Sequence, residues 1–217
     1  MNNPDIIPNT IAFVKQQLKD AEGGHDWFHI LRVYNNTMLI ARSEKADMLV
    51  VQLGALLHDI ADSKFHNGDE SVGPKMARTF LENENADRET IDHVVKIIEN
   101  ISFKGSYGKL AFRSRELDIV QDADRLDAIG AIGIARAFNY GGFKNRELHN
   151  PDIPPQQYKT KAAYKNNKAP TINHFYEKLL LLKDRMNTET GRKIAEERHR
   201  FMEDFLEQFY GEWEGTR

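Results

Sequence analysis

Residues 53–62 read Leu-Gly-Ala-Leu-Leu-His-Asp-Ile-Ala-Asp, an apolar helical stripe that runs into His58 and Asp59. Apolar residues at three- and four-residue spacing predict a buried helix. A carboxylate at the end of such a helix is costly unless a hydrogen bond, an ion pair or a cation compensates it. The stretch therefore predicts a core helix and, at its end, a candidate metal site.

The same helical spacing of apolar residues recurs along most of the chain. It marks further helices near 11–18, 28–38, 94–101 and 119–138. A last helix is expected from Asn187 or Thr188 to about Tyr210. No segment shows strand alternation bounded by turns. We therefore predict an all-α fold, a compact bundle of eight or nine helices with no significant sheet.

The length of 217 residues is typical of one domain. We expect a single domain over 1–217, with a core at about 20–140 and C-terminal helices at about 170–211 packed on it. Two segments, 103–113 and 141–169, lack this periodicity and are rich in Gly, Pro and Lys. Long loops of this kind are often functional. The second is therefore either a lid over the site or a connector.

Composition excludes several classes of function. The chain has no cysteine, so disulfides, thiolate metal sites and a cysteine nucleophile are excluded. A net charge of -3 gives no general attraction to nucleic acid, which is not an expected partner. The mean hydropathy is -0.62, and no apolar run approaches the ~18 residues of a membrane span. We expect a cytoplasmic protein without a membrane partner, and a homodimer stays open.

Two further blocks of sequence contain candidate metal ligands in helical surroundings. Together with the first block they supply two imidazoles and two carboxylates, from His29, His58, Asp59 and Asp124. Such a set suits one divalent ion, manganese first, with Mg, Co, Ni, Fe or Zn as alternatives. Simpler explanations exist for each residue alone, His29 as a core histidine and His58 as a hydrogen-bonded helix end. All four together, in this order, favour the metal site.

Three motifs resemble the HD-domain metal-dependent phosphohydrolases, in particular their YpgQ/YedJ-like branch. They are GHDWFHILRV at 24–33, ALLHDIAD at 55–62 and QDADRLDAIGAIGIARAF at 121–138. The resemblance covers roughly residues 5–210. It implies hydrolysis of a phosphorylated small molecule, with nucleoside triphosphates cleaved to monophosphate and pyrophosphate as the first candidates. A nucleotidase, a phosphodiesterase or a metal- or nucleotide-binding sensor without turnover are the alternatives.

Three residues are candidates for catalytic roles in that reaction. Asp62 follows His58 by one helical turn, where a carboxylate can orient or deprotonate a water molecule. Arg32 and Lys64 are candidate phosphate-binding residues. An exposed helix-end acid, an ion pair between Arg32 and Asp59 or Asp62, and a solvated loop lysine are the simpler explanations.

Substrate contacts are expected from basic residues near the loops, although solvated loop charge is the default explanation for them. The candidates are His25, Lys104, Lys144 and Lys159. His66 and His93 could add a second metal. A surface position is the better explanation for His93, so we predict one metal ion.

Two acidic residues beside the candidate ligands have structural explanations. Asp26 lies three residues before His29, and a helix N-cap is the simplest account of it. Asp127 follows Asp124 by three residues and shares its helical face. It either orients a ligand histidine or forms a buried ion pair.

Overall fold

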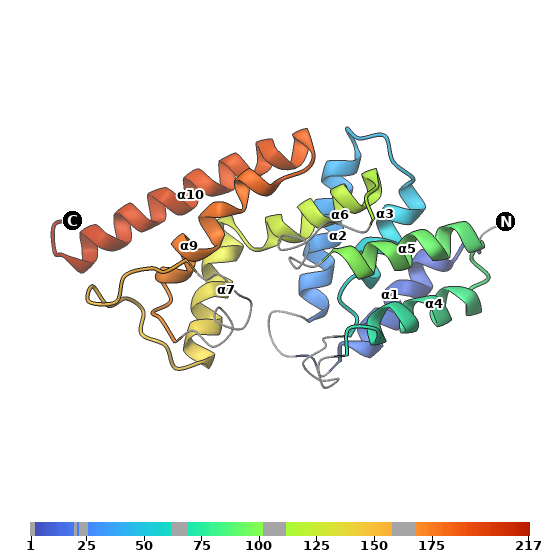
Figure 1. The fold of residues 1–217 in the computed structure, drawn as a ribbon, viewed down its shortest axis with the longest axis horizontal. Helices are drawn as coiled ribbons and strands as arrows, with labels where there is room; N and C mark the ends of the chain where they lie inside the picture. The colour runs from blue at the N-terminus through green and yellow to red at the C-terminus, as the bar shows by residue number, and fades with distance from the viewer. Residues whose placement is uncertain (1–2, 20, 22–25, 62–68, 102–111, 158–167) are drawn as a thin grey trace. The chain divides into compact units, whose positions relative to one another are not determined.

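The computed structural model describes residues 3–19, 21, 26–61, 69–101, 112–157 and 168–217 (Figure 1). Every regular element in these ranges is a helix, which confirms the all-α prediction. The α-helices are α1 (Ile6–Gln17), α2 (Trp27–Ala41), α3 (Met48–Leu57), α4 (Val72–Asn83), α5 (Arg88–Asn100), α6 (Arg115–Asp127), α7 (Gly130–Phe143), α9 (Asn173–Glu177) and α10 (Glu189–Trp213). Two 3-10 helices, η3 (Leu179–Leu181) and η4 (Lys183–Arg185), precede α10.

The chain divides into two compact units, Met1–Asp124 and Arg125–Arg217. The division falls inside α6, near its C-terminal end. The expectation of a single domain stays a prediction. Among the described helices, none combines the length and the hydropathy that a membrane span needs.

Helix α3 is the centre of the first unit, where it packs against α1, α2 and α5 (Figure 1). Seven of its ten residues are buried, as expected for a helix that is apolar on every side. Gly54 lies midway along it, and a Cβ there would come within 3.3 Å of Ile97 and 3.4 Å of Val120. The glycine therefore lets the side chains of α5 and α6 approach the α3 backbone.

Side-chain caps fix where several of these helices begin. The carboxylate of Asp47 accepts hydrogen bonds from the first-turn amides of α3, and Asp26 and Asp87 do the same for α2 and α5. Each cap satisfies an amide that has no acceptor within its own helix. The N-cap role expected for Asp26 is confirmed.

In the second unit, α10 packs against α7 and η4, and the buried ring of Phe175 contacts the partly exposed rings of Phe138 and Phe205. Thr188 caps α10 through the Gly191 amide, in agreement with the predicted start, and the helix continues beyond Tyr210 to Trp213. The predicted apolar stretch 119–138 is interrupted, because α6 ends at Asp127 and α7 begins at Gly130. Gly130 has φ +72°, a conformation that glycine adopts without the usual steric penalty.

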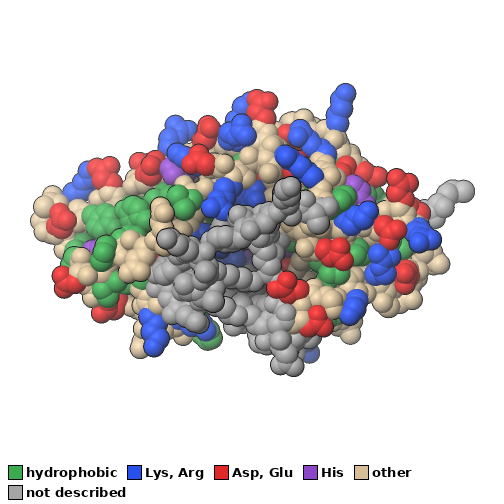
Figure 2. Space-filling model, viewed as in Figure 1, with side chains coloured by type: hydrophobic (Ala, Val, Ile, Leu, Met, Phe, Trp, Pro, Cys, Tyr) green, Lys and Arg blue, Asp and Glu red, His purple; other side chains and the backbone are tan. Residues whose placement is uncertain are grey.

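Charged side chains of both signs lie on the surface of the first unit. On the face drawn in Figure 2, acidic and basic groups lie beside one another over this unit. On α5, for example, Asp92 pairs with Arg78 at 2.8 Å and with Arg88 at 3.7 Å. Among the described residues on this face, the charges of the first unit are therefore mixed in sign rather than gathered into a basic stripe.

Candidate metal centre

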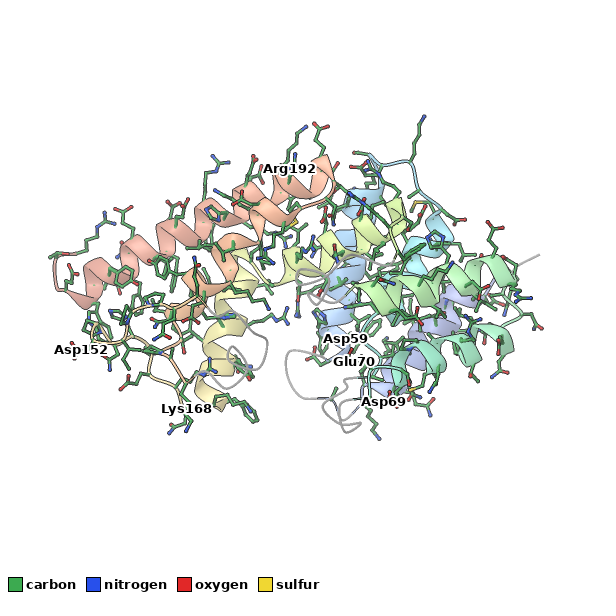
Figure 3. All side chains as sticks on the ribbon, viewed as in Figure 1. Asp59, Asp69, Glu70, Asp152, Lys168 and Arg192 are labelled. Atoms are coloured by element: carbon green, nitrogen blue, oxygen red, sulfur yellow. The ribbon has the colours of Figure 1, made fainter. Side chains whose placement is uncertain are left out.

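Three helices of the first unit bring the four candidate ligands together. His29 lies in the first turn of α2, and Asp124 lies near the C-terminal end of α6. His58 directly follows α3, and Asp59, labelled in Figure 3, comes next. Because His58 and Asp59 lie at the end of the helix rather than within it, adjacent residues can face one site.

The distances between these side chains make His29, His58 and Asp59 a possible metal site, with Asp124 beside both imidazoles. His29 Nε2 lies 3.6 Å from Asp124 Oδ1 and 4.0 Å from Asp59 Oδ2, and His58 Nε2 lies 3.9 Å from Asp124 Oδ1. These separations are too long for hydrogen bonds. Ligand atoms that are each about 2.0–2.3 Å from one ion lie up to ~4.5 Å apart. One ligand atom from each of His29, His58 and Asp59 lies within 4.8 Å of the others.

The hydrogen bonding of His58 leaves one nitrogen available to a cation. Its Nδ1 lies 2.9 Å from the Ala55 carbonyl oxygen, which can only accept a hydrogen bond, so this nitrogen carries the proton. Its Nε2 is buried and has no hydrogen-bond partner among the described residues. A buried polar atom without a partner is costly. A cation bound by the Nε2 lone pair would remove this cost, so the residues present suit a metal ion.

Exposure differs between the two kinds of ligand. The side chains of His29 and His58 are 3% and 4% exposed, whereas those of Asp59 and Asp124 are 23% and 38% exposed. The imidazoles therefore belong to the core of the unit, and the carboxylates reach solvent. A substrate oxygen can approach the site from the carboxylate side.

Of the other predicted site residues, the structure describes Arg32 and Lys144. Arg32 is half-buried on α2, one turn after His29. Lys144 is exposed after α7 in the second unit, where its Nζ lies 4.7 Å from the ring centre of Phe143. The predictions for His25, Asp62, Lys64, His66, Lys104 and Lys159 lie outside the described residues. None of these roles is tested by the geometry.

His93 has contacts of its own, away from the four candidate ligands. Its Nε2 lies 2.8 Å from Ser114 Oγ and 3.4 Å from Glu116 Oε2. These contacts connect α5 to the start of α6. His93 is half-buried rather than fully at the surface, and its contacts suit a structural role.

Two polar residues on α6 and α2 have roles that follow from their partners. Asp127 is 1% exposed and pairs with Arg136, which favours the buried ion pair over an orienting role. Asn36, buried on α2, donates from Nδ2 to the Ala123 carbonyl oxygen at 3.3 Å. This bond connects α2 to α6 next to Asp124. Sequence reasoning missed Asn36, and the only available signal was a polar residue on the same face as His29.

Several known proteins are similar to this chain over almost its whole length, and one family model matches part of it. The HD domain family model matches residues 27–129. The Bacillus subtilis protein YpgQ is 40% identical over 203 residues, which cover 91% of this chain and 88% of YpgQ. The crystal structure of an HD-superfamily hydrolase from Bacillus thuringiensis is 43% identical, with a TM-score of 0.78 and 98% of each chain covered. The crystal structure of YpgQ in complex with ADP is 35% identical, with a TM-score of 0.74, and covers 98% of this chain and 97% of that one.

Proposed function

This chain belongs to the HD-domain family of metal-dependent phosphohydrolases, and from that premise we propose that it hydrolyses nucleoside triphosphates to nucleoside monophosphate and pyrophosphate. Deoxynucleoside triphosphates are the first substrates to test. The observation that carries the proposal is the approach of two buried imidazole nitrogens to Asp124 Oδ1, at 3.6 and 3.9 Å. In this proposal one ion binds at this arrangement, and an anionic substrate approaches it from the exposed carboxylate side.

We assign the ion to His29, His58, Asp59 and Asp124. Two neutral imidazoles and two carboxylates balance the charge of a divalent cation. The mixture of nitrogen and oxygen donors suits manganese, and it also suits iron, cobalt, nickel or zinc. Magnesium prefers a site made of oxygen donors, so it is the weaker candidate.

The roles of the protein side chains follow from their positions in the sequence. A divalent ion, when bound, acts as a Lewis acid toward phosphoryl oxygens and water. Asp62 would accept a proton from the attacking water, since it follows His58 by only four residues in the sequence and a carboxylate can act as a general base. Arg32 and Lys64 would stabilise the charge that grows on the non-bridging oxygens. The reaction would be a direct displacement by water without a covalent intermediate.

The proposed substrate class has support from a relative. The YpgQ structure contains ADP, and that chain is 35% identical to this one. A nucleoside diphosphate contains both the base and the phosphoanhydride that a nucleoside triphosphate would present. ADP is not itself a triphosphate, so the bond that is cleaved has to be established from products.

Turnover of a nucleotide panel tests the proposal directly. Purified, manganese-loaded protein would be incubated with ribo- and deoxynucleoside tri-, di- and monophosphates, and the products separated by chromatography. Pyrophosphate with nucleoside monophosphate would support the proposal. Orthophosphate released from monophosphates would instead indicate a nucleotidase. Metal binding without turnover of any nucleotide would favour a different phosphoester or a sensor.

A pair of variants distinguishes the activity of this protein from that of a contaminating enzyme. His58→Gln removes the imidazole whose Nε2 has no hydrogen-bond partner among the described residues. We expect this protein to lose metal and turnover together. Lys45→Gln changes an exposed residue before α3 and is expected to keep both. Full activity of His58→Gln would contradict the ligand assignment.

A further inference from the structure

The first turn of α2 contains a candidate ligand and is held by one neighbouring side chain. Asp26 lies just before the helix with φ -85° and ψ 176°, the extended conformation of an N-cap residue. Its Oδ1 accepts a hydrogen bond from the backbone amide of His29 at 2.9 Å. The Asp26 carbonyl oxygen accepts from the Ile30 amide at 3.3 Å. Asp26 therefore fixes the backbone of the residue that carries the imidazole.

Because His29 lies in the first turn of α2, the cap affects where its imidazole is placed. His29 is the third residue of α2, and the first amides of a helix have no acceptor within the helix. Its side chain is 3% exposed, and its Nε2 lies 3.6 Å from Asp124 Oδ1. A small change in the first turn would move this nitrogen relative to Asp124 and Asp59.

We infer that Asp26 is a positioning residue that sets the metal affinity of the site through the His29 backbone. Without the cap, the first turn frays in a fraction of the molecules. The apparent affinity then falls in proportion to the fraction in which His29 is in place. The inference rests on the proposed metal site and does not depend on which substrate is hydrolysed.

Another capped helix in the same unit supplies a matched control. Asp87 caps α5 through the same kind of bond, since its Oδ1 accepts from the Thr90 amide at 2.9 Å, and its Oδ2 also accepts from the Thr90 hydroxyl at 2.7 Å. Helix α5 contains none of the four candidate ligands. Loss of the Asp87 cap is therefore expected to destabilise the protein at least as much as loss of the Asp26 cap. Only the loss of the α2 cap should weaken metal binding in addition to lowering the stability of the protein.

The experiment compares full-length Asp26→Ala, Asp26→Asn and Asp87→Ala with the unaltered protein. Manganese affinity would be measured by titration calorimetry, and amide hydrogen exchange would be measured without metal. We expect Asp26→Ala to weaken manganese binding about threefold to tenfold and to speed exchange at His29 and Ile30. Asp26→Asn keeps a capping oxygen and should stay within about twofold of the unaltered protein. Asp87→Ala should leave manganese affinity unchanged.

Three results would overturn the inference. Asp26→Ala could bind manganese as tightly as the unaltered protein. Asp87→Ala could weaken binding as much as Asp26→Ala, which would show a general effect of stability. Asp26→Asn could be as weak as Asp26→Ala, which would show that the charge of Asp26 matters and not its cap. Failure to hydrolyse nucleotides would affect none of these measurements.

Discussion

Acidification to about pH 5 is expected to destabilise the second unit through one imidazole, that of His174 in α9. Part of its surface is accessible, yet the surrounding protein atoms desolvate the ring. This burial, followed by the charges of Lys178 and Arg146, lowers the pKa of His174 from 6.5 to about 3. The folded protein therefore keeps this imidazole neutral at pH values where the unfolded chain protonates it.

The sign and size of the effect follow from that difference in pKa. Below pH 6.5 the unfolded state binds a proton that the folded state does not, so the free energy of unfolding falls as the pH falls. The loss continues down to about pH 3. With 1.36 kcal/mol for each pKa unit, His174 contributes a loss of about 2 kcal/mol between pH 7 and pH 5.

A variant without the titrating group isolates this contribution. Urea unfolding would be measured at about pH 7 and pH 5 for the unaltered protein and for His174→Gln. The loss of stability on acidification should be about 2 kcal/mol smaller in the variant, because all other groups titrate in both proteins. NMR of the His174 ring would give its pKa directly. A His174 pKa near 6.5, with equal losses in both proteins, would refute the reasoning.

Three further predictions concern the ion and the helix packing. Asp124→Asn should lower manganese affinity by more than about tenfold, as measured by calorimetry. Manganese at about 100 times its dissociation constant should stabilise the unaltered protein by about 2.7 kcal/mol in thermal unfolding, and a chelator should reverse this. Gly141→Ala would place a Cβ 2.1 Å from Thr171 Oγ1 and should destabilise the protein by about 1–3 kcal/mol in urea unfolding. Its control is Gly142→Ala, where nothing lies within 4 Å, and an equal loss there would contradict the packing argument.

The helices could be predicted because their signals are local, whereas the assignment of the four ligands to one ion stays a prediction. An apolar stripe marks α3, and the His-Asp pair directly after it is unusual in such surroundings. The cap of α2 is similarly local, since Asp26 and the amide it binds are three residues apart. Features that depend on neighbours in the sequence were therefore accessible without a structure.

Features that depend on distant partners were not accessible in this way. Asn36 contacts Ala123, which is 87 residues away in the sequence, and nothing near Asn36 indicates that partner. His93 on α5 contacts Ser114, which is 21 residues away in the sequence and directly precedes α6. The break at Gly130 was missed because apolar residues continue at helical spacing across it. A glycine within such a pattern is equally compatible with an uninterrupted helix.

The contrast in exposure between the two kinds of ligand has a consequence for ion exchange. If the proposed ion binds here, we expect the exposed carboxylates to move during its entry or release, while the buried side chains of His29 and His58 keep their positions. A carboxylate can bind through one oxygen or two, so Asp59 and Asp124 can adjust to ions of different radius and coordination number. We therefore expect the ion present in the cell to be set by the relative concentrations of divalent metals more than by rigid selection at the site.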